Sequence, residues 1–228
     1  MRRKRLARIF SSIFLLLVTA LAVSGVGFTI RQLERFQQRD PVATLEADLK
    51  EVRGVEVTDR ARRREISRIM KLIDRYNATM PSSLKYTIAR EIYDMAQKYD
   101  NLNVDLICAT ITHESARTWD PQVVSNVGAM GLMQIMPSTG KFLSQFENFN
   151  WTSPKEILFD PVKNIRLGCR YLSTLIEFYG VEGGLAAYNG GEKRAAMWLA
   201  NNKADGILWE ETQNYVPAVM RLYSKFKN

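Results

Sequence analysis

Glu114 is the residue whose surroundings in the sequence point most directly to chemistry. It follows an apolar run containing Leu106, Ile107, Ala109 and Ile111, and it precedes the glycine-punctuated segment SNVGAMGLMQIMP. A carboxyl group that emerges from a hydrophobic core is partly desolvated, which raises its pKa and suits it to general acid catalysis. The glycine-rich segment is typical of backbone that folds tightly along a cleft where a ligand approaches closely.

Few other side chains compete for a chemical role. The chain has one histidine, His113, and two cysteines, Cys108 and Cys169, which is too few for a zinc cluster. His113 is adjacent to Glu114, but neighbouring residues on a helix do not face one another, so we expect His113 to point away from the acid. The two cysteines fall in two predicted helices, and a disulfide and two buried free thiols both remain open.

The elements that position Glu114 are predicted to be helices. Asn103 is a suitable N-cap for a helix from Val104 through Ser115, which places Glu114 near its C-terminal end. Asp160 and Pro161 start a later helix that Gly180 ends. Apolar residues at helical spacing predict two amphipathic helices before the site, with the stripes Ile66, Ile69, Leu72, Ile73 and Leu84, Ile88, Ile92, Met95.

The remaining segments complete a mostly helical prediction. Helical patterns recur around GLAAYN, in EKRAAMWLANN and from Glu211 to Phe226, while a small β element is expected between Trp119 and Leu132. The fold class predicted is therefore all-α, or α+β with minimal β structure. The four tryptophans are expected to be core residues rather than surfaces that stack on a ligand.

The N-terminus carries a membrane signal. Five of the basic residues that give the net charge of +8 precede Ile9, and Ile9 to Ile30 is a run of 22 residues without a charge. Such a run is long enough to cross a bilayer as a helix, and the basic flank predicts a cytoplasmic N-terminus with the rest of the chain outside. A signal peptide cleaved near Ala22 to Ser24 is the alternative. Beyond residue 30 the 27 basic and 24 acidic side chains nearly balance, and no nucleic-acid ligand is expected.

Several ordered motifs resemble a known family, the soluble-lytic-transglycosylase type of peptidoglycan lytic transglycosylase, which has a goose-lysozyme-like fold. The resemblance covers roughly Ile88 to Tyr223, and it rests on the pair Glu114 and Ser115 followed by PQVVSNVGAMGLMQIMP, DPVKNIRLGCRYL, AAYNGG and ETQNYV. Each motif alone is weak, but their order and spacing are specific. One departure is that Trp119 follows Glu114 by five residues, whereas the family places an aromatic residue three positions after its glutamate.

The resemblance implies a catalytic role for Glu114 and a sugar cleft around it. Residues that match cleft positions are Ser125, Gln134, Met136, Tyr188, Asn189, the secondary acid Glu211, and Tyr215. The implied reaction cleaves the bond between N-acetylmuramic acid and N-acetylglucosamine in peptidoglycan and forms a 1,6-anhydro end, with no metal or organic cofactor. An inactive peptidoglycan-binding scaffold and a water-using muramidase are the alternatives, and protein partners are left open.

The expected organisation follows from these segments. It comprises a basic cytoplasmic flank (1–8), a transmembrane anchor in the inner membrane (9–30), a linker or stalk (31–61), an accessory helical segment (62–82) and the lysozyme-like catalytic domain (83–228). With this orientation the catalytic domain faces the periplasm or cell wall.

Overall fold

The computed structural model describes residues 41 to 227. The predicted anchor, Ile9 to Ile30, and its basic flank lie outside these residues. No helix in the described part of the chain is long and apolar enough to span a membrane. The chain divides into two compact units between Asp59 and Arg60. The first described helix, α2 (Pro41–Tyr76), runs through this division and includes much of the segment predicted as a stalk.

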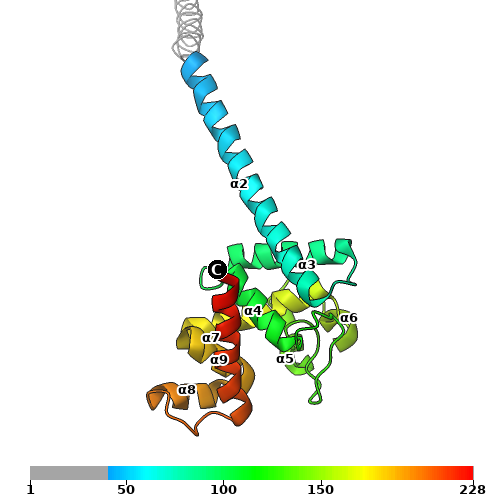
Figure 1. Cartoon of the computed structure of the whole chain (residues 1–228), viewed down its shortest axis with the longest axis vertical. Helices are drawn as coiled ribbons and strands as arrows, with labels where there is room; N and C mark the ends of the chain where they lie inside the picture. Colours follow the sequence, from blue (N-terminus) through cyan, green and yellow to red (C-terminus); the bar gives the residue numbers. More distant parts are fainter. Residues whose placement is uncertain (1–40, 228) are drawn as a thin grey trace, which may run out of the picture. The chain divides into compact units, whose positions relative to one another are not determined.

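The unit that begins at Arg60 is built from helices (Figure 1). After α2 come α3 (Ser82–Lys98), α4 (Val104–Glu114), α5 (Pro137–Ser144), α6 (Pro154–Leu158), α7 (Pro161–Gly190), α8 (Glu192–Ala200) and α9 (Glu210–Lys227). Between residues 41 and 227 there is no strand, and the expected β element consists of two isolated antiparallel bridges, Val124 with Met130 and Met130 with Ile135. The prediction of a mostly helical fold is confirmed for the described residues.

Helix α4 lies in the middle of the hydrophobic core. It packs against α9, while α7 contacts α3, α8 and α9 (Figure 1). Ile107, Ala109 and Ile111 are fully buried, as the apolar run before Glu114 predicts. Cys108 and Cys169 are both buried and both free, which is the thiol alternative rather than the disulfide. Because α4 is surrounded by other helices, its C-terminal residue Glu114 emerges directly from the core.

The predicted helix signals act as expected at α4 and α7. The Asn103 side chain accepts a hydrogen bond from the Leu106 N–H at 3.0 Å, and Asp160 accepts from the N–H groups of Val162 and Lys163. Gly180, with φ of 68°, interrupts the helical geometry of α7, so the AAYNGG motif lies on a second helical segment. Left-handed backbone of this kind favours glycine. The short helices α5 and α6 were not predicted.

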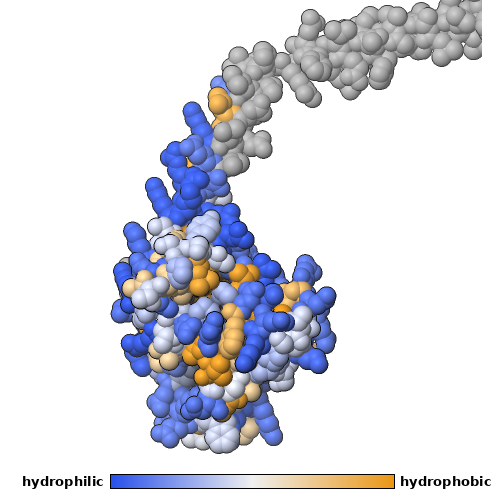
Figure 2. All heavy atoms as spheres, turned by 90° about the vertical axis from the view of Figure 1, so that its right-hand side faces the viewer, coloured by the Kyte–Doolittle hydropathy of each residue, from blue (hydrophilic) through white to orange (hydrophobic). Residues whose placement is uncertain are grey.

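The surface of the described residues is mostly hydrophilic on the face seen in Figure 2, where a patch of hydrophobic side chains interrupts it. Several large apolar side chains between α4 and α6 are exposed, namely Val124, Val127, Met136, Phe142 and Phe146. Val127 and Met136 also line the pocket at Glu114. Apolar groups at the edge of a pocket are suited to contact the nonpolar faces of a ligand.

Candidate active site

The residues predicted for the site come together around one pocket of about 360 Å³. It is formed by the end of α4, the loop that follows it, the C-terminal part of α7 and the start of α9. All eight predicted site residues line it: Glu114, Ser125, Gln134, Met136, Tyr188, Asn189, Glu211 and Tyr215. The pocket also includes His113, Val127 and Ala129, to which the sequence assigned no role there.

Glu114 lies in this pocket as a partly buried acid. The Tyr215 hydroxyl donates a hydrogen bond to Glu114 Oε1 at 2.6 Å. Burial raises the pKa of Glu114 to about 7, the Tyr215 hydrogen bond opposes that rise, and the negative charge of Glu211 adds to it. A carboxyl group with this pKa exists in both protonation states near neutral pH, so it can donate a proton and later accept one.

Tyr215 is the side chain that fixes Glu114 in place. It is almost fully buried on α9, and burial together with the charge of Glu114 raises the pKa of its phenol, which therefore remains a neutral hydrogen-bond donor. The His113 ring packs edge-on against Tyr215, with 4.8 Å between ring centroids. His113 thus lines the pocket together with Glu114, a position that the sequence did not predict. Burial lowers the pKa of His113, which favours its neutral form.

Tyr188 joins α7 to the loop that forms the pocket floor. Its hydroxyl donates to the Met133 carbonyl at 2.7 Å. Burial, with a further contribution from the Glu114 charge, raises the pKa of Tyr188, so this phenol also stays protonated. The family resemblance implied that Tyr188 lines the sugar cleft. Its hydroxyl proton is used in a bond within the protein, while the hydroxyl oxygen can still accept a hydrogen bond from a ligand.

The loop from 121 to 136 holds its polar side chains by internal hydrogen bonds. Ser125 Oγ accepts from the Ala129 N–H at 3.0 Å. Gln134 adopts a left-handed backbone with φ of 47°, and its side-chain amide donates to the carbonyls of Gly131 and Val123. These contacts give the floor of the pocket a defined shape before any ligand binds.

Asn164 supports the same loop from α7, and no role was predicted for it individually. Its Nδ2 donates to the carbonyls of Met130 and Leu158, at 2.9 and 3.0 Å, and its Oδ1 accepts from the Met133 N–H at 2.8 Å. The side chain is fully buried, so each of these bonds satisfies a group that water cannot reach. The available signal was a polar amide within the apolar helical pattern of NIRLGC.

Gly131 allows this close approach between the loop and Asn164. Its φ is 80°, and a Cβ at this position would lie 2.2 Å from the Leu158 carbonyl oxygen and 2.3 Å from Asn164 Nδ2. No side chain fits there. Gly131, the second glycine of the motif GAMGLMQ, is therefore required by the packing of the floor against α6 and α7.

Glu211 stands at the other side of the pocket in a polar chain of contacts. The Thr212 hydroxyl donates to Asn189 Oδ1 at 2.7 Å, and Asn189 Nδ2 lies 3.4 Å from Glu211 Oε1. Glu211 is exposed, whereas Thr212 is buried. Asn189 is thus oriented by Thr212, and the charge of Glu211 remains available to act on Glu114 and on a ligand.

The departure from the family pattern after Glu114 is accommodated by a tight loop. Ala116, Arg117 and Trp119 all adopt left-handed backbone, with φ between 50° and 64°. Trp119 is fully buried, its Nε1 donates to Thr112 Oγ1 at 3.1 Å, and its N–H donates to Ser115 Oγ. Trp119 is therefore a core residue, as expected, and it does not line the pocket. Trp209 is exposed, which corrects the expectation that all four tryptophans are core residues.

The comparison with known families decides the classification. The sequence matches the family described as "Transglycosylase SLT domain" over residues 91–208, which is more than half of the chain. The chain belongs to this family. Residues 91–208 include Glu114 and every predicted pocket residue except Glu211 and Tyr215, which follow the matched region in α9.

Individual relatives of this chain are lytic murein transglycosylases, in agreement with the family match. It is 37% identical over 123 residues to the soluble lytic murein transglycosylase of Escherichia coli K12, covering 49% of this chain and 19% of the relative. It is 33% identical over 118 residues to membrane-bound lytic murein transglycosylase C of Salmonella paratyphi B, covering 47% of this chain and 32% of the relative. The chain thus spans less than a third of the length of either protein.

The fold agrees with a solved structure of the same kind. The crystal structure of the 70-kDa soluble lytic transglycosylase from Escherichia coli superimposes with a TM-score of 0.54 and 30% identity, covering 66% of this chain and 27% of that one. This supports the lysozyme-like class expected for the domain. Within residues 41–227 no group of three or more His, Cys, Asp or Glu side chains is placed to hold a metal ion.

Proposed function

We propose that the protein is a lytic transglycosylase that cleaves the glycan strands of peptidoglycan without consuming water. The observation that carries the proposal is Glu114, a carboxyl group with a pKa raised to about 7, held by Tyr215 in a pocket lined by the other family-matched residues. Membership of the SLT domain family and the names of the relatives support the same activity.

The proposed reaction uses Glu114 twice. Protonated Glu114 donates its proton to the oxygen of the bond between N-acetylmuramic acid and N-acetylglucosamine, and the bond from that oxygen to muramoyl C1 breaks. The N-acetyl group of the muramoyl sugar stabilises the positive charge at C1. The Glu114 carboxylate then removes the proton from the C6 hydroxyl of that sugar, and O6 bonds to C1 to close a 1,6-anhydro ring.

Glu211 is proposed to act through its charge and through sugar contacts. Most glycoside hydrolases use two carboxyl groups, one as acid and one as nucleophile or base. In this protein Glu114 also serves as the base, and the C6 hydroxyl of the substrate replaces water as the nucleophile. Glu211 raises the pKa of Glu114 and keeps it protonated at higher pH, which favours the first step. Ser125, Gln134, Met136, Tyr188 and Asn189 are proposed to line the subsites for the sugars.

The proposed location is the outer face of the inner membrane. The uncharged run from Ile9 to Ile30 and its basic flank support a single-pass anchor, or a signal peptide as the alternative. One relative is a membrane-bound enzyme. A reporter enzyme fused after Asn228 is expected to be active only outside the cytoplasm, and activity inside it would contradict this location.

Product analysis tests the proposed activity. Purified peptidoglycan sacculi are digested in water labelled with heavy oxygen, and the released muropeptides are weighed by mass spectrometry. We expect 1,6-anhydro products, which lack one water and carry no label. Labelled reducing ends would instead identify a water-using muramidase, and binding without any release would identify a scaffold.

A further inference from the structure

A second pocket adjoins the active site. It has a volume of about 520 Å³, and His113 lines both it and the pocket at Glu114. The other lining residues come from the end of α2, the loop after α4 and the C-terminal part of α9, namely Tyr76, Ala116, Arg117, Ala218, Arg221, Leu222 and Lys225. We call this site the basic pocket.

The basic pocket contains three cationic side chains and no acidic one. Arg117, Arg221 and Lys225 are all exposed, and in the part of the chain that the structure describes their side chains make no hydrogen bond or ion pair. Other arginines of the domain pair with carboxylates, as Arg68 does with Asp105, Arg166 with Glu91 and Arg170 with Glu147. Unneutralised cations gathered in one concave site attract an anionic ligand.

The loop after α4 holds Arg117 at this pocket by strained backbone. Ala116 and Arg117 have φ of 50° and 64°, and the Arg117 N–H donates to the Thr112 carbonyl at 2.8 Å. Left-handed backbone costs free energy for residues other than glycine and persists where the surroundings determine it. Here the buried Trp119 anchors the loop. Arg117 lies between Ser115 and Trp119, where this chain has two more residues than the family pattern places before its aromatic residue.

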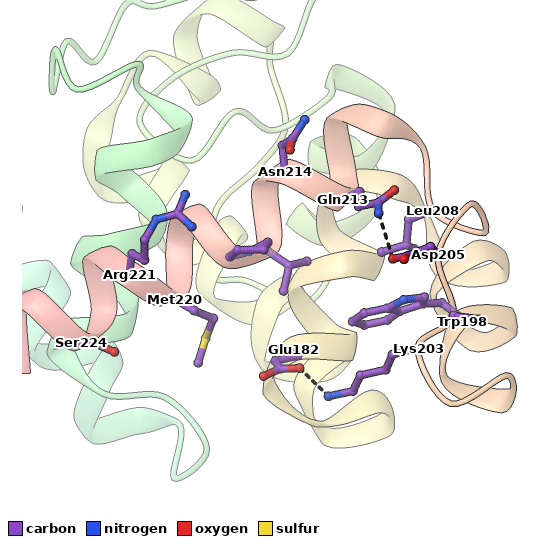
Figure 3. A pocket seen from close by; sticks show the side chains of 13 residues that line it. Glu182, Trp198, Lys203, Asp205, Leu208, Gln213, Asn214, Met220, Arg221 and Ser224 are labelled. Carbon is purple, nitrogen blue, oxygen red and sulfur yellow. Dashed lines mark hydrogen bonds and ion pairs between the residues drawn. The ribbon is translucent and has the colours of Figure 1, made fainter.

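A larger neighbouring pocket is lined by both acidic and basic side chains. It has a volume of about 800 Å³ and lies along α9 between α7 and α8 (Figure 3). Its charged groups are mostly satisfied, since Lys203 pairs with Glu182 and Gln213 donates to Asp205. Arg221 stands at the opposite end of that pocket from Trp198 (Figure 3). Arg221 therefore has no acidic partner in either pocket that it lines.

We propose that the basic pocket binds the carboxylates of the peptide stem on a muramoyl sugar bound in the active-site pocket. The inference rests on the proposed function, because the stem is attached to the sugar whose bond Glu114 cleaves. Stem peptides carry free carboxylates, and guanidinium groups bind carboxylates through paired hydrogen bonds. Since His113 is common to both pockets, a strand that fills the active site brings its stem to Arg117, Arg221 and Lys225.

The test compares three glycan substrates: strands with intact stems, strands freed of stems by an amidase, and strands whose stem carboxylates have been amidated. For the wild type we expect kcat/KM on intact strands to exceed that on the other two by about fivefold, the effect of two exposed charge contacts. Arg221→Gln with Lys225→Gln should reduce kcat/KM on intact strands to the stem-free value and leave the stem-free value unchanged. Arg117→Asn, which tolerates left-handed backbone, should act in the same direction.

A matched control removes two exposed cations elsewhere, with Lys71→Gln and Lys155→Gln, and should preserve the preference for intact strands. Binding is measured in parallel in a Glu114→Gln background, so that the pocket is assessed without turnover. There, the Arg221 and Lys225 substitutions should weaken binding of intact strands only. Equal effects on all three substrates, or none, would overturn the proposal. Stem-dependent binding by a protein without cleavage would instead contradict the proposed function and leave the pocket supported.

Discussion

Glu114 is subject to two opposing electrostatic influences besides burial. The hydrogen bond from Tyr215 stabilises its carboxylate and lowers its pKa, whereas the nearby charge of Glu211 destabilises the carboxylate and raises it. Desolvation is the largest effect and places the pKa at about 7. The same residue can therefore act as acid and base with little adjustment, because its two protonation states differ little in free energy near neutral pH.

The pH dependence of activity should show the opposite effects of Glu211 and Tyr215 on the pKa of Glu114. Because the acid form of Glu114 is required, kcat/KM should fall as pH rises through about 7. Glu211→Gln removes a charge that raises the pKa of Glu114, so this fall should move to lower pH. Tyr215→Phe removes a bond that lowers it, so the fall should move to higher pH. The measurement is the pH profile of kcat/KM on peptidoglycan fragments, and shifts in the same direction would contradict the assignment.

At the residue scale, the sequence predicted the acid better than its partners. The apolar residues before Glu114 were enough to predict desolvation, because burial follows from composition. The hydrogen bond from Tyr215 joins residues 101 positions apart, and only the family resemblance brought them together. The place of His113 at the pocket was not predicted, because helix geometry relates neighbours on one helix but does not show that Tyr215 of α9 contacts both of them.

At the scale of elements, Asn164 ties the pocket floor to α6 and α7. Its buried side chain makes three hydrogen bonds to backbone groups, donating two and accepting one. These backbone groups have no partner in a regular helix or sheet. Buried groups that lose their partner cost about 1–3 kcal/mol each. The floor, with Gly131 packed against the same side chain, therefore depends on this amide for its shape.

Asn164→Ala should destabilise the fold by about 2–4 kcal/mol and should also lower activity per folded molecule, because the loop that carries Gln134 loses its support. The free energy of unfolding is measured by urea titration. The kcat is measured without denaturant, at a temperature at which the variant remains folded. Asn101→Ala is the control, since Asn101 bonds to Ser173 away from the pocket. The Asn101→Ala control should keep its kcat. If Asn164→Ala also lost stability but kept its kcat, Asn164 would have no role in positioning the floor.

Helix ends were predictable where a side chain caps them. Asn103 and Asp160 both form the expected bonds, because an N-cap is a local interaction. The short helices α5 and α6 were missed although Pro137 and Pro154 stand in their first turns. Such short segments lack a clear apolar period and depend on packing against the rest of the domain.

At the scale of the molecule, α2 contributes to the same core as the SLT domain. Ile66, Ile69, Leu72 and Ile73 are buried within the hydrophobic cluster that contains α4 and α7 residues. These residues belong to the unit that begins at Arg60, although the predicted catalytic domain began at residue 83. The amphipathic stripe predicted these core positions, but a stripe alone does not identify the surface that it covers.

Two truncated proteins test where the folding unit begins. A protein starting at Asp59 retains the four buried isoleucine and leucine side chains and should be soluble, helical by circular dichroism and active. A protein starting at Asn77 loses them, at about 1.5–3 kcal/mol each, which is comparable to the whole stability of a domain. It should be unfolded or aggregated. If the shorter protein folded with equal stability, residues 60–76 would be an accessory segment.

In the proposed reaction one carboxyl group, Glu114, both donates and accepts the proton. Glu114→Gln preserves the shape of the side chain and can still accept the Tyr215 hydrogen bond, but it cannot perform either transfer. The decisive measurement is the rate at which wild-type and Glu114→Gln protein release 1,6-anhydro-muropeptides from sacculi, with binding to peptidoglycan assayed as the control for folding. We expect a fall of at least ~10²-fold with binding retained; release at a rate near that of the wild type would contradict the account.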